Sequence, residues 1–347
     1  MERIGIMAAT IKDVAKLANT STATVSKVMN GSYSISEATV QRVRDAMQEL
    51  QYTPNKRAQN FAKQASGTVA FVTTLERDTA FTNPHMFEIM SGLQFSLARK
   101  GYGMVLIGLV EGNCAAVEEL MLQKSVDGVV FHAAIMTREL SQLVLKYDFA
   151  HVVIGTPNFP SKLCWIDNNN PISGELAACH LLETGKRRVA YIGGREVDAI
   201  SESRLKGAKA ALNEAHLPMQ AHLLLRGEST QEDGCRMAEA LLSGTPRPDA
   251  IICANNEIAL GCMKALNAHK IAIPETIAVV TFDDYPFSRI TDPPLTVVNI
   301  DVYDLGIQAG KMILDKMRKP NLQFQTFITL PKLIVRGSTV ECFPRNS

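Results

Sequence analysis

The chain has 347 residues, 46% of them hydrophobic, and a formal net charge of +1. A chain of this length and apolar content can bury more than one core, so we expect two or three domains. No run of about eighteen apolar residues occurs, which argues against a transmembrane helix, and the amino terminus is too short and too mixed for a secretory signal. Met7, just before the first predicted helix, is an alternative start of translation.

The stretch from Thr10 to Asn30 predicts two short helices around a tight turn. Thr10 with Asp13 three positions later starts the first helix as a capping box. Asn19 tolerates the left-handed backbone of a turn, and Ser21 is a good cap for the second helix. The side chains expected to face outward from that helix are small or polar: Thr22, Ala23, Ser26 and Lys27. This is the layout of a helix-turn-helix, whose second helix enters the DNA major groove; the alternative is an ordinary helical domain.

A third helix is predicted from its cap at Ser36 to a stop at Pro54. Its apolar stripe contains Val40, Val43, Met47 and Leu50. Three helices in this span make a small headpiece, residues 1–53, rather than a catalytic domain. Residues 1–63 hold nine Lys or Arg against five Asp or Glu, so positive charge is concentrated at the end that we expect to touch phosphate.

A basic, helix-compatible linker, residues 54–66, precedes a long region in which β-rich and helical patterns alternate. One series of β-rich runs lies at 69–72, 104–107, 129–131 and 152–154, and a second at 189–192, 223–225, 251–253 and 277–280. Such alternation predicts parallel sheets with helices on both faces, and two series predict two lobes. Because ligands of these folds bind outside the carboxyl ends of the strands, we expect a binding cleft between the lobes.

The sequence gives little support to an enzyme or a metal protein. It has no G-x-S-x-G, no G-x-x-x-x-G-K-[ST] and no G-x-G-x-x-G after a strand. The seven histidines lack metal-site spacing, and the seven cysteines are odd in number without a C-x-x-C pair. These cysteines fit thiols in a reducing cytoplasm, so we expect a cytoplasmic protein with no metal and no cofactor.

The amino-terminal stretch and the region after it resemble the LacI/GalR family of transcription regulators. The family signature reads T-x-x-D-V-A-x-x-A-G-V-S-x-x-T-V-S-x-x-L-N. The chain matches it at Thr10, Asp13, Val14, Ala15, Ala18, Ser21, Thr24, Val25, Ser26 and Asn30. The chain differs from the signature at three positions: it has Asn19-Thr20 where the signature has Gly-Val, and Met29 where the signature has Leu. Later segments also fit the family, among them 127–130, 166–168, 282–284 and 330–339.

The resemblance implies a sequence-specific DNA-binding regulator, with repression as its expected role. Expected DNA contacts are Thr10, Ser21, Thr22, Ala23, Thr24, Ser26, Lys27, Asn30, Asn55, Arg57, Ala58 and Phe61. In the family the linker is a hinge helix that folds on the operator and inserts an apolar wedge into the minor groove, and Phe61 stands at the wedge position. The alternative is that Phe61 packs against the headpiece.

The implied fold is α/β: an all-α helix-turn-helix headpiece plus a hinge helix, joined to a two-lobe core like that of periplasmic binding proteins, with two parallel sheets. The core is expected at 67–347, with a first lobe at about 67–165 plus 297–326 and a second lobe at about 166–296 plus 327–340. The rival is a periplasmic-type solute-binding protein without DNA function. The missing signal peptide and the basic headpiece argue against that rival.

The effector-binding residues implied by the resemblance are Arg204, Asn255 and Asp283. A guanidinium, an amide and a carboxylate suit vicinal hydroxyls, which indicates a carbohydrate-like effector: a sugar, sugar acid or sugar phosphate. The alternatives are an ion pair between Arg204 and Asp283 and a helix cap at Asn255. Asn256 and Gly155 stand where the family often has Asp, and this loss of carboxylates favours an anionic effector.

The lone tryptophan, Trp165, lies at a predicted lobe crossover, where it either stacks on a sugar ring or packs as a hinge residue. The chain ends without a leucine heptad, so we expect a homodimer rather than a tetramer, reading a pseudo-palindromic operator of double-stranded DNA.

Overall fold

The computed structural model describes residues 9–29, 35–53, 65–75, 84–109 and 114–340. The chain divides into two compact units, residues 1–66 and 67–347. Most of the predicted hinge segment, residues 54–64, lies outside the described residues.

Within its described residues, the first unit contains three short helices around a small apolar core. They are α1 (Ile11–Leu17), α2 (Thr22–Met29) and α3 (Glu37–Glu49). Val14, Val25 and Val43, one from each helix, are fully buried against one another. The predicted three-helix headpiece is therefore confirmed.

The turn chemistry expected between α1 and α2 is present. The main-chain N–H and the hydroxyl of Thr10 donate to the Asp13 carboxylate at 2.8 and 2.7 Å, which lowers the pKa of Asp13. Asn19 adopts the left-handed backbone, with φ +47°. Ser21 Oγ accepts from the Thr24 N–H at 3.1 Å. The predicted cap at Ser36 differs: its hydroxyl contacts the Thr39 hydroxyl instead of a backbone N–H.

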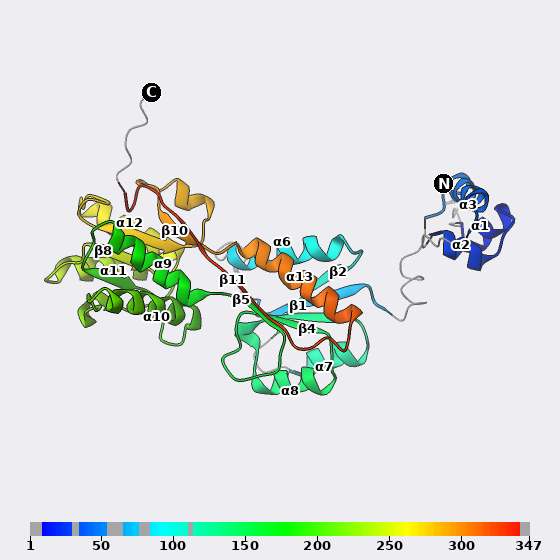
Figure 1. Ribbon diagram of the computed structural model, residues 1–347, viewed down its shortest axis with the longest axis horizontal. Helices are drawn as coiled ribbons and strands as arrows, with labels where there is room; N and C mark the ends of the chain where they lie inside the picture. The colour runs from blue at the N-terminus through cyan, green and yellow to red at the C-terminus, as the bar shows by residue number, and fades with distance from the viewer. Residues whose placement is uncertain (1–8, 30–34, 54–64, 76–83, 110–113, 341–347) are drawn as a thin grey trace, which may run out of the picture. The chain divides into compact units, whose positions relative to one another are not determined.

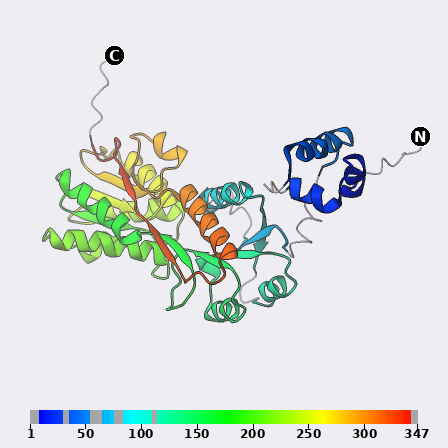
Figure 2. The same ribbon diagram turned by 45° about the vertical axis from the view of Figure 1, so that its right-hand side comes forward.

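The second unit contains two lobes, each built on one sheet (Figures 1 and 2). The first sheet has the order β11-β5-β4-β3-β1-β2, and all its pairings are parallel. Its strands are β1 (Thr68–Thr73), β2 (Gly103–Gly108), β3 (Gly128–His132), β4 (His151–Ile154), β5 (Trp165–Asn168) and β11 (Thr326–Thr329). Its helices are α6 (Pro84–Ala98), α7 (Cys114–Leu122), α8 (Arg138–Lys146) and α13 (Val302–Arg318).

Side-chain alternation along β1 explains how this sheet is covered. Val69 and Phe71 pack with α6 and α13, whereas Ala70 and Val72 pack with α7 and α8. Because successive strand side chains point to opposite faces, a strand buried on both faces reads as a continuous apolar run. This is the pattern that the sequence carries at 69–72.

The second sheet has the order β12-β10-β9-β8-β6-β7. Its strands are β6 (Val189–Ile192), β7 (Leu224–Leu225), β8 (Ala250–Cys253), β9 (Ala278–Phe282), β10 (Thr296–Asn299) and β12 (Lys332–Ile334). Its helices are α9 (Asn170–Glu183), α10 (Ala199–Glu214), α11 (Gln231–Ser243) and α12 (Asn256–Ala268), with α9 packed on α10 and α11 on α12. None of the helices in the described ranges combines the length and apolarity needed to cross a membrane.

The two-lobe, mostly parallel fold is confirmed, with three differences in detail. β12 pairs antiparallel with β10, although parallel sheets were predicted. Leu223 ends a 3-10 turn, so only two residues of the predicted run at 223–225 form a strand. The crossovers also follow Asn168, Asn299 and Thr329, three residues beyond each expected lobe boundary. The expected boundaries divided β5, β10 and β11, because the chain leaves a lobe at the carboxyl end of a strand.

A buried histidine anchors the end of the first sheet. One ring nitrogen of His151 contacts the Phe149 carbonyl oxygen at 2.7 Å, and the other accepts from the Cys164 N–H at 3.2 Å. Both contacts require the neutral ring, with one nitrogen donating and the other accepting. Burial accordingly lowers the pKa of His151 from its ordinary value of 6.5.

Candidate functional site

The second helix of the headpiece presents an exposed face of the predicted kind. Thr22, Ala23 and Lys27 are exposed, while Val25 is fully buried in the headpiece core. The helix begins where Ser21 caps it, so Thr22 and Ala23 occupy its first turn. Short side chains at the start of an exposed helix allow close approach to base edges in a major groove.

Other predicted DNA contacts have structural roles or lie outside the described residues. Ser21 and Thr24 form the α2 cap, and Thr10 forms the α1 capping box. Ser26 is partly exposed on α2. Outside the described residues are Asn30, Asn55, Arg57, Ala58 and Phe61.

A cavity of about 680 Å³ is lined by both lobes of the second unit. The first lobe contributes Pro84, His85, Met86 and His132. The second lobe contributes Asp198, Ile200, Ser201, Arg204, Ser229, Thr230, Gln231, Glu232, Ala254, Asn255, Asn256, Glu257, Asp283, Tyr285 and Phe287. The three predicted effector residues therefore line one cavity, although they come from separate segments of the chain.

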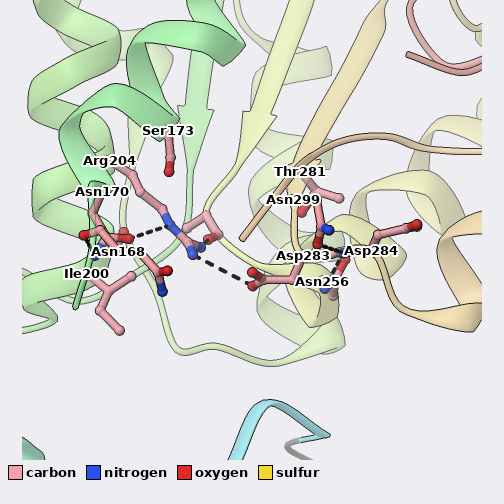
Figure 3. A network of polar contacts seen from close by, with 12 residues as sticks. Asn168, Asn170, Ser173, Ile200, Arg204, Asn256, Thr281, Asp283, Asp284 and Asn299 are labelled. Carbon is pink, nitrogen blue, oxygen red and sulfur yellow. Dashed lines mark hydrogen bonds and ion pairs between the residues drawn. The ribbon is translucent and has the colours of Figure 1, made fainter. Parts of the chain in front are cut away.

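Arg204 lies on α10 with only 3% of its surface exposed. Its Nη2 lies 3.6 Å from the Asp283 Oδ2, and its Nη1 donates to the Ala254 carbonyl at 3.0 Å (Figure 3). Its guanidinium carbon lies 4.2 Å from the centre of the Phe282 ring, a cation–π distance. The ion pair considered as an alternative is thus present, inside the cavity wall.

Asp283 directly follows β9 and adopts a left-handed backbone, with φ +67°. Such a conformation in a residue other than glycine is strained and is often found at ligand sites. The side chain is buried, and its Oδ1 has no hydrogen-bond partner among the described residues. A buried acceptor without a donor is costly, so this atom favours a ligand that brings a hydroxyl or amino group.

The two asparagines that follow β8 have different roles. Asn255 accepts from the Ile258 N–H at 3.1 Å and caps α12, as the structural alternative predicted. Asn256 is buried and donates from Nδ2 to the main-chain oxygen of Asp283 at 3.3 Å. Its own Oδ1 lacks a partner in the described part of the chain. Asn256 therefore adds a second unpaired acceptor beside Asp283.

The first lobe contributes two histidines that we did not predict. Burial lowers the pKa of His132 to about 4, and burial also lowers that of His85, opposed by the charge of Asp283. Both rings are therefore neutral near pH 7. His132 is the last residue of β3, at the carboxyl edge where ligands of this fold bind. A histidine at the end of a predicted strand could therefore have been identified from the sequence as a candidate site residue.

Tyr285 and Phe287 add an aromatic part to the cavity, with ring centres 5.9 Å apart. The Tyr285 hydroxyl is buried without a partner among the described side chains, and burial raises its pKa. By contrast, Trp165 packs against the first-lobe core and does not line the cavity, which agrees with its reading as a hinge residue.

The charges of the cavity are mostly negative. Its described lining carries four carboxylates, of Asp198, Glu232, Glu257 and Asp283, against the single guanidinium of Arg204. Carboxylates and amide oxygens accept hydrogen bonds, and aromatic rings contact apolar ring faces. No three or more His, Cys, Asp or Glu side chains gather in the described ranges in a way that could hold a metal ion.

Comparison with known proteins matches both units. Residues 10–55 match the bacterial regulatory proteins of the lacI family, and residues 178–339 match a periplasmic binding protein-like domain. The ribose operon repressor of Escherichia coli (strain K12) is 30% identical, over 95% of this chain and 99% of its own. The HTH-type transcriptional repressor PurR of Vibrio vulnificus (strain CMCP6) is 29% identical, over 95% and 98%.

A solved structure of the transcriptional regulator CelR in complex with cellobiose is 29% identical, with a TM-score of 0.71. It covers 95% of this chain and 99% of its own. These relatives span the headpiece and both lobes together, and the curated ones are repressors, not enzymes or solute-binding proteins. The chain therefore belongs to the LacI family of DNA-binding transcriptional repressors, with a periplasmic-binding-protein-like effector domain.

Proposed function

We propose that the protein is a cytoplasmic homodimer that represses transcription from a pseudo-palindromic operator, and that a neutral, hydroxyl-rich molecule such as a sugar changes its operator affinity. The observation that carries the effector part is the buried Arg204–Asp283 pair in a cavity lined by both lobes. A ligand there contacts both lobes and favours one lobe arrangement over another. Such differential binding is typically worth about 1–3 kcal/mol.

On the DNA side, Thr22, Ala23 and Lys27 set the base preference. Ala23 offers only a methyl group, so its favourable contact is with a thymine methyl. Phe61 wedges between base pairs at the centre of the operator. Ala23→Ser with an unchanged operator preference contradicts the first role. Phe61→Ala that weakens operator and random DNA equally contradicts the wedge.

The effector class follows from the cavity's hydrogen-bonding groups and charge. The unpaired oxygens of Asp283 and Asn256 need donors, which sugar hydroxyls provide. The four carboxylates disfavour the anionic effector that the missing family aspartates had favoured. Relatives named for the ribose operon and for a cellobiose complex support a sugar.

A self-association surface is supported by exposed apolar side chains on one edge of the first lobe. This α6–β2 patch comprises Phe87, Phe95 and Leu106, which are 58%, 46% and 40% exposed; Leu106 points to the same face of the sheet as Met104, which packs with α6. β2 is an edge strand, and an apolar edge is usually covered in a working assembly. Leu106→Glu should shift the sedimentation coefficient toward a monomer, while Leu122→Glu, at an exposed site on α7, should not.

The test of the effector combines two assays on the full chain. An operator is first selected from random duplex DNA. Thermal shift is then measured with D-ribose, D-glucose, cellobiose, D-gluconate, D-ribose 5-phosphate and adenosine, and compounds that stabilise the chain are tested for a change in operator affinity. We expect a neutral sugar to act in both assays. A response limited to gluconate or the sugar phosphate contradicts the proposal of a neutral effector. Failure to select any DNA contradicts the proposed role as a DNA-binding regulator.

A further inference from the structure

A series of hydrogen bonds through Asn170 and Asn168 runs from the cavity to the interlobe crossovers. Arg204 Nε donates to Asn170 Oδ1 at 3.4 Å, and Asn170 Nδ2 donates to the Asn168 carbonyl oxygen at 3.3 Å (Figure 3). Asn168 Oδ1 in turn accepts from the Thr329 hydroxyl. Asn168 and Thr329 are the last residues of β5 and β11, immediately before two of the three crossovers.

Helix capping does not account for the Asn170 side chain. The cap of α9 is Asn169, whose Oδ1 accepts from the Ile172 N–H at 3.2 Å. Asn170 is 6% exposed, and both ends of its amide are occupied, one by Arg204 and the other by Asn168. The Asn170 side chain therefore connects the Arg204 guanidinium, which lines the cavity, to β5, the strand that leads into the first crossover.

Close helix packing holds the two ends of this link at a fixed separation. A Cβ atom on Gly174 of α9 would lie 1.7 Å from the Arg204 carbonyl oxygen. A Cβ atom on Gly207 of α10 would lie 1.8 Å from the Pro171 carbonyl oxygen. Glycine at both positions lets the backbones of α9 and α10 touch. A displacement of Arg204 on α10 therefore also displaces the start of α9.

The partner of Arg204 is tied to the remaining crossover. Asp284, next to Asp283, donates its main-chain N–H to Asn299 Oδ1 at 3.1 Å. Asn299 is the last residue of β10, directly before the second crossover. Arg336 Nη2 lies 2.7 Å from Asp284 Oδ1 and holds this corner in place.

We infer that Asn170 and Asn299 are positioning residues that couple the Arg204–Asp283 pair to the interlobe hinge, by which we mean the three chain crossovers after Asn168, Asn299 and Thr329. This inference rests on the proposed effector function. A ligand that takes over contacts of Arg204 or Asp283 shifts the two side chains relative to each other. Because each is tied to a different crossover, the shift biases the hinge, and the two lobe arrangements differ in their affinity for DNA.

The test measures coupling separately from ligand binding. For the full chain, the operator Kd is measured with and without saturating D-ribose, D-glucose or cellobiose, and binding of each probe is followed by thermal shift. For the unaltered chain, we expect the operator Kd values with and without the probe to differ by about 5- to 150-fold for at least one probe. In Asn170→Ala the ratio should fall toward 1, while the probe still raises the melting temperature.

Asn170→Asp separates the two halves of the link, because its carboxylate still accepts from Arg204 but no longer donates to Asn168. Asn170→Asp should bind the probe, but its ratio of operator Kd values should fall toward 1. We expect the same of Asn299→Ala, which provides the test if Asn170→Ala fails to fold. Asn213→Ala, an exposed asparagine on α10, is the matched control and should keep the ratio.

Wild-type ratios in Asn170→Asp and Asn299→Ala overturn the inference while leaving the effector function intact, even if the melting temperatures fall. If none of the three sugars changes operator affinity in the unaltered chain, the proposed function fails and the inference falls with it.

Discussion

The buried Arg204–Asp283 pair gives the sharpest energetic prediction. Arg204→Met keeps an apolar side chain in the cavity wall but removes the guanidinium that lies over Phe282, and it leaves Asp283 buried without its cation. At the observed 3.6 Å and an effective dielectric constant of about 20, Coulomb's law gives about 5 kcal/mol for the pair. Removing one partner of a buried pair typically costs about 3–5 kcal/mol. We therefore expect Arg204→Met to lower the free energy of unfolding by about 3–5 kcal/mol.

Urea unfolding of the full chain, followed by circular dichroism, measures this cost. Arg204→Met combined with Asp283→Asn removes the stranded charge and should recover a large part of the loss. The matched control is Arg195→Met, because Arg195 pairs with Glu228 at 3.0 Å but both side chains are more than half exposed. An exposed pair is worth about 0–1 kcal/mol. The reasoning is refuted if Arg204→Met costs no more than Arg195→Met.

Three further predictions concern packing, pH and capping. Gly174→Ala should lower the melting temperature and push α9 from α10, because its Cβ would overlap a backbone oxygen, whereas Gly244→Ala meets only ordinary contacts at 3.6 Å and should be tolerated. The folded-state pKa of His151 lies below 6.5, so its contribution to stability is complete above that pH and is lost as pH falls. The urea midpoint should thus drop between about pH 7.5 and 5.5, and less steeply in His151→Gln; equal slopes contradict this. Ser21→Ala should cost about 1 kcal/mol in headpiece stability and weaken operator binding, and an unchanged melting curve contradicts the cap.

Much of the fold could be predicted because its elements follow local rules. The headpiece turn is readable from Asn19 and Ser21, whose backbone and capping preferences act within a few residues. The central strands are apolar on both faces and stand out from the helical patterns around them. The crossover strands are harder: β5 and β11 have four residues each, and Asn168 pairs with Thr329, which is 161 positions away. Nothing local encodes that pairing.

The cavity was predictable only in part. Arg204 and Asp283 were identified through the family resemblance, and the structure brings them together in one cavity wall. Asn170 and His85 carry no local signal, because an asparagine after a cap and a single histidine near a helix start are common in any protein. Their roles arise from packing between distant segments, such as the backbone contact of α9 with α10 at Gly174 and Gly207.

The central claim is that a ligand in this cavity controls DNA binding through Arg204. The most direct measurement is the ratio of operator Kd values with and without a saturating amount of the sugar that gives the largest thermal shift, for the unaltered chain and for Arg204→Met. We predict a ratio of about 5- to 150-fold for the unaltered chain and a ratio near 1 for the variant. Equal ratios in the two proteins would contradict the claim.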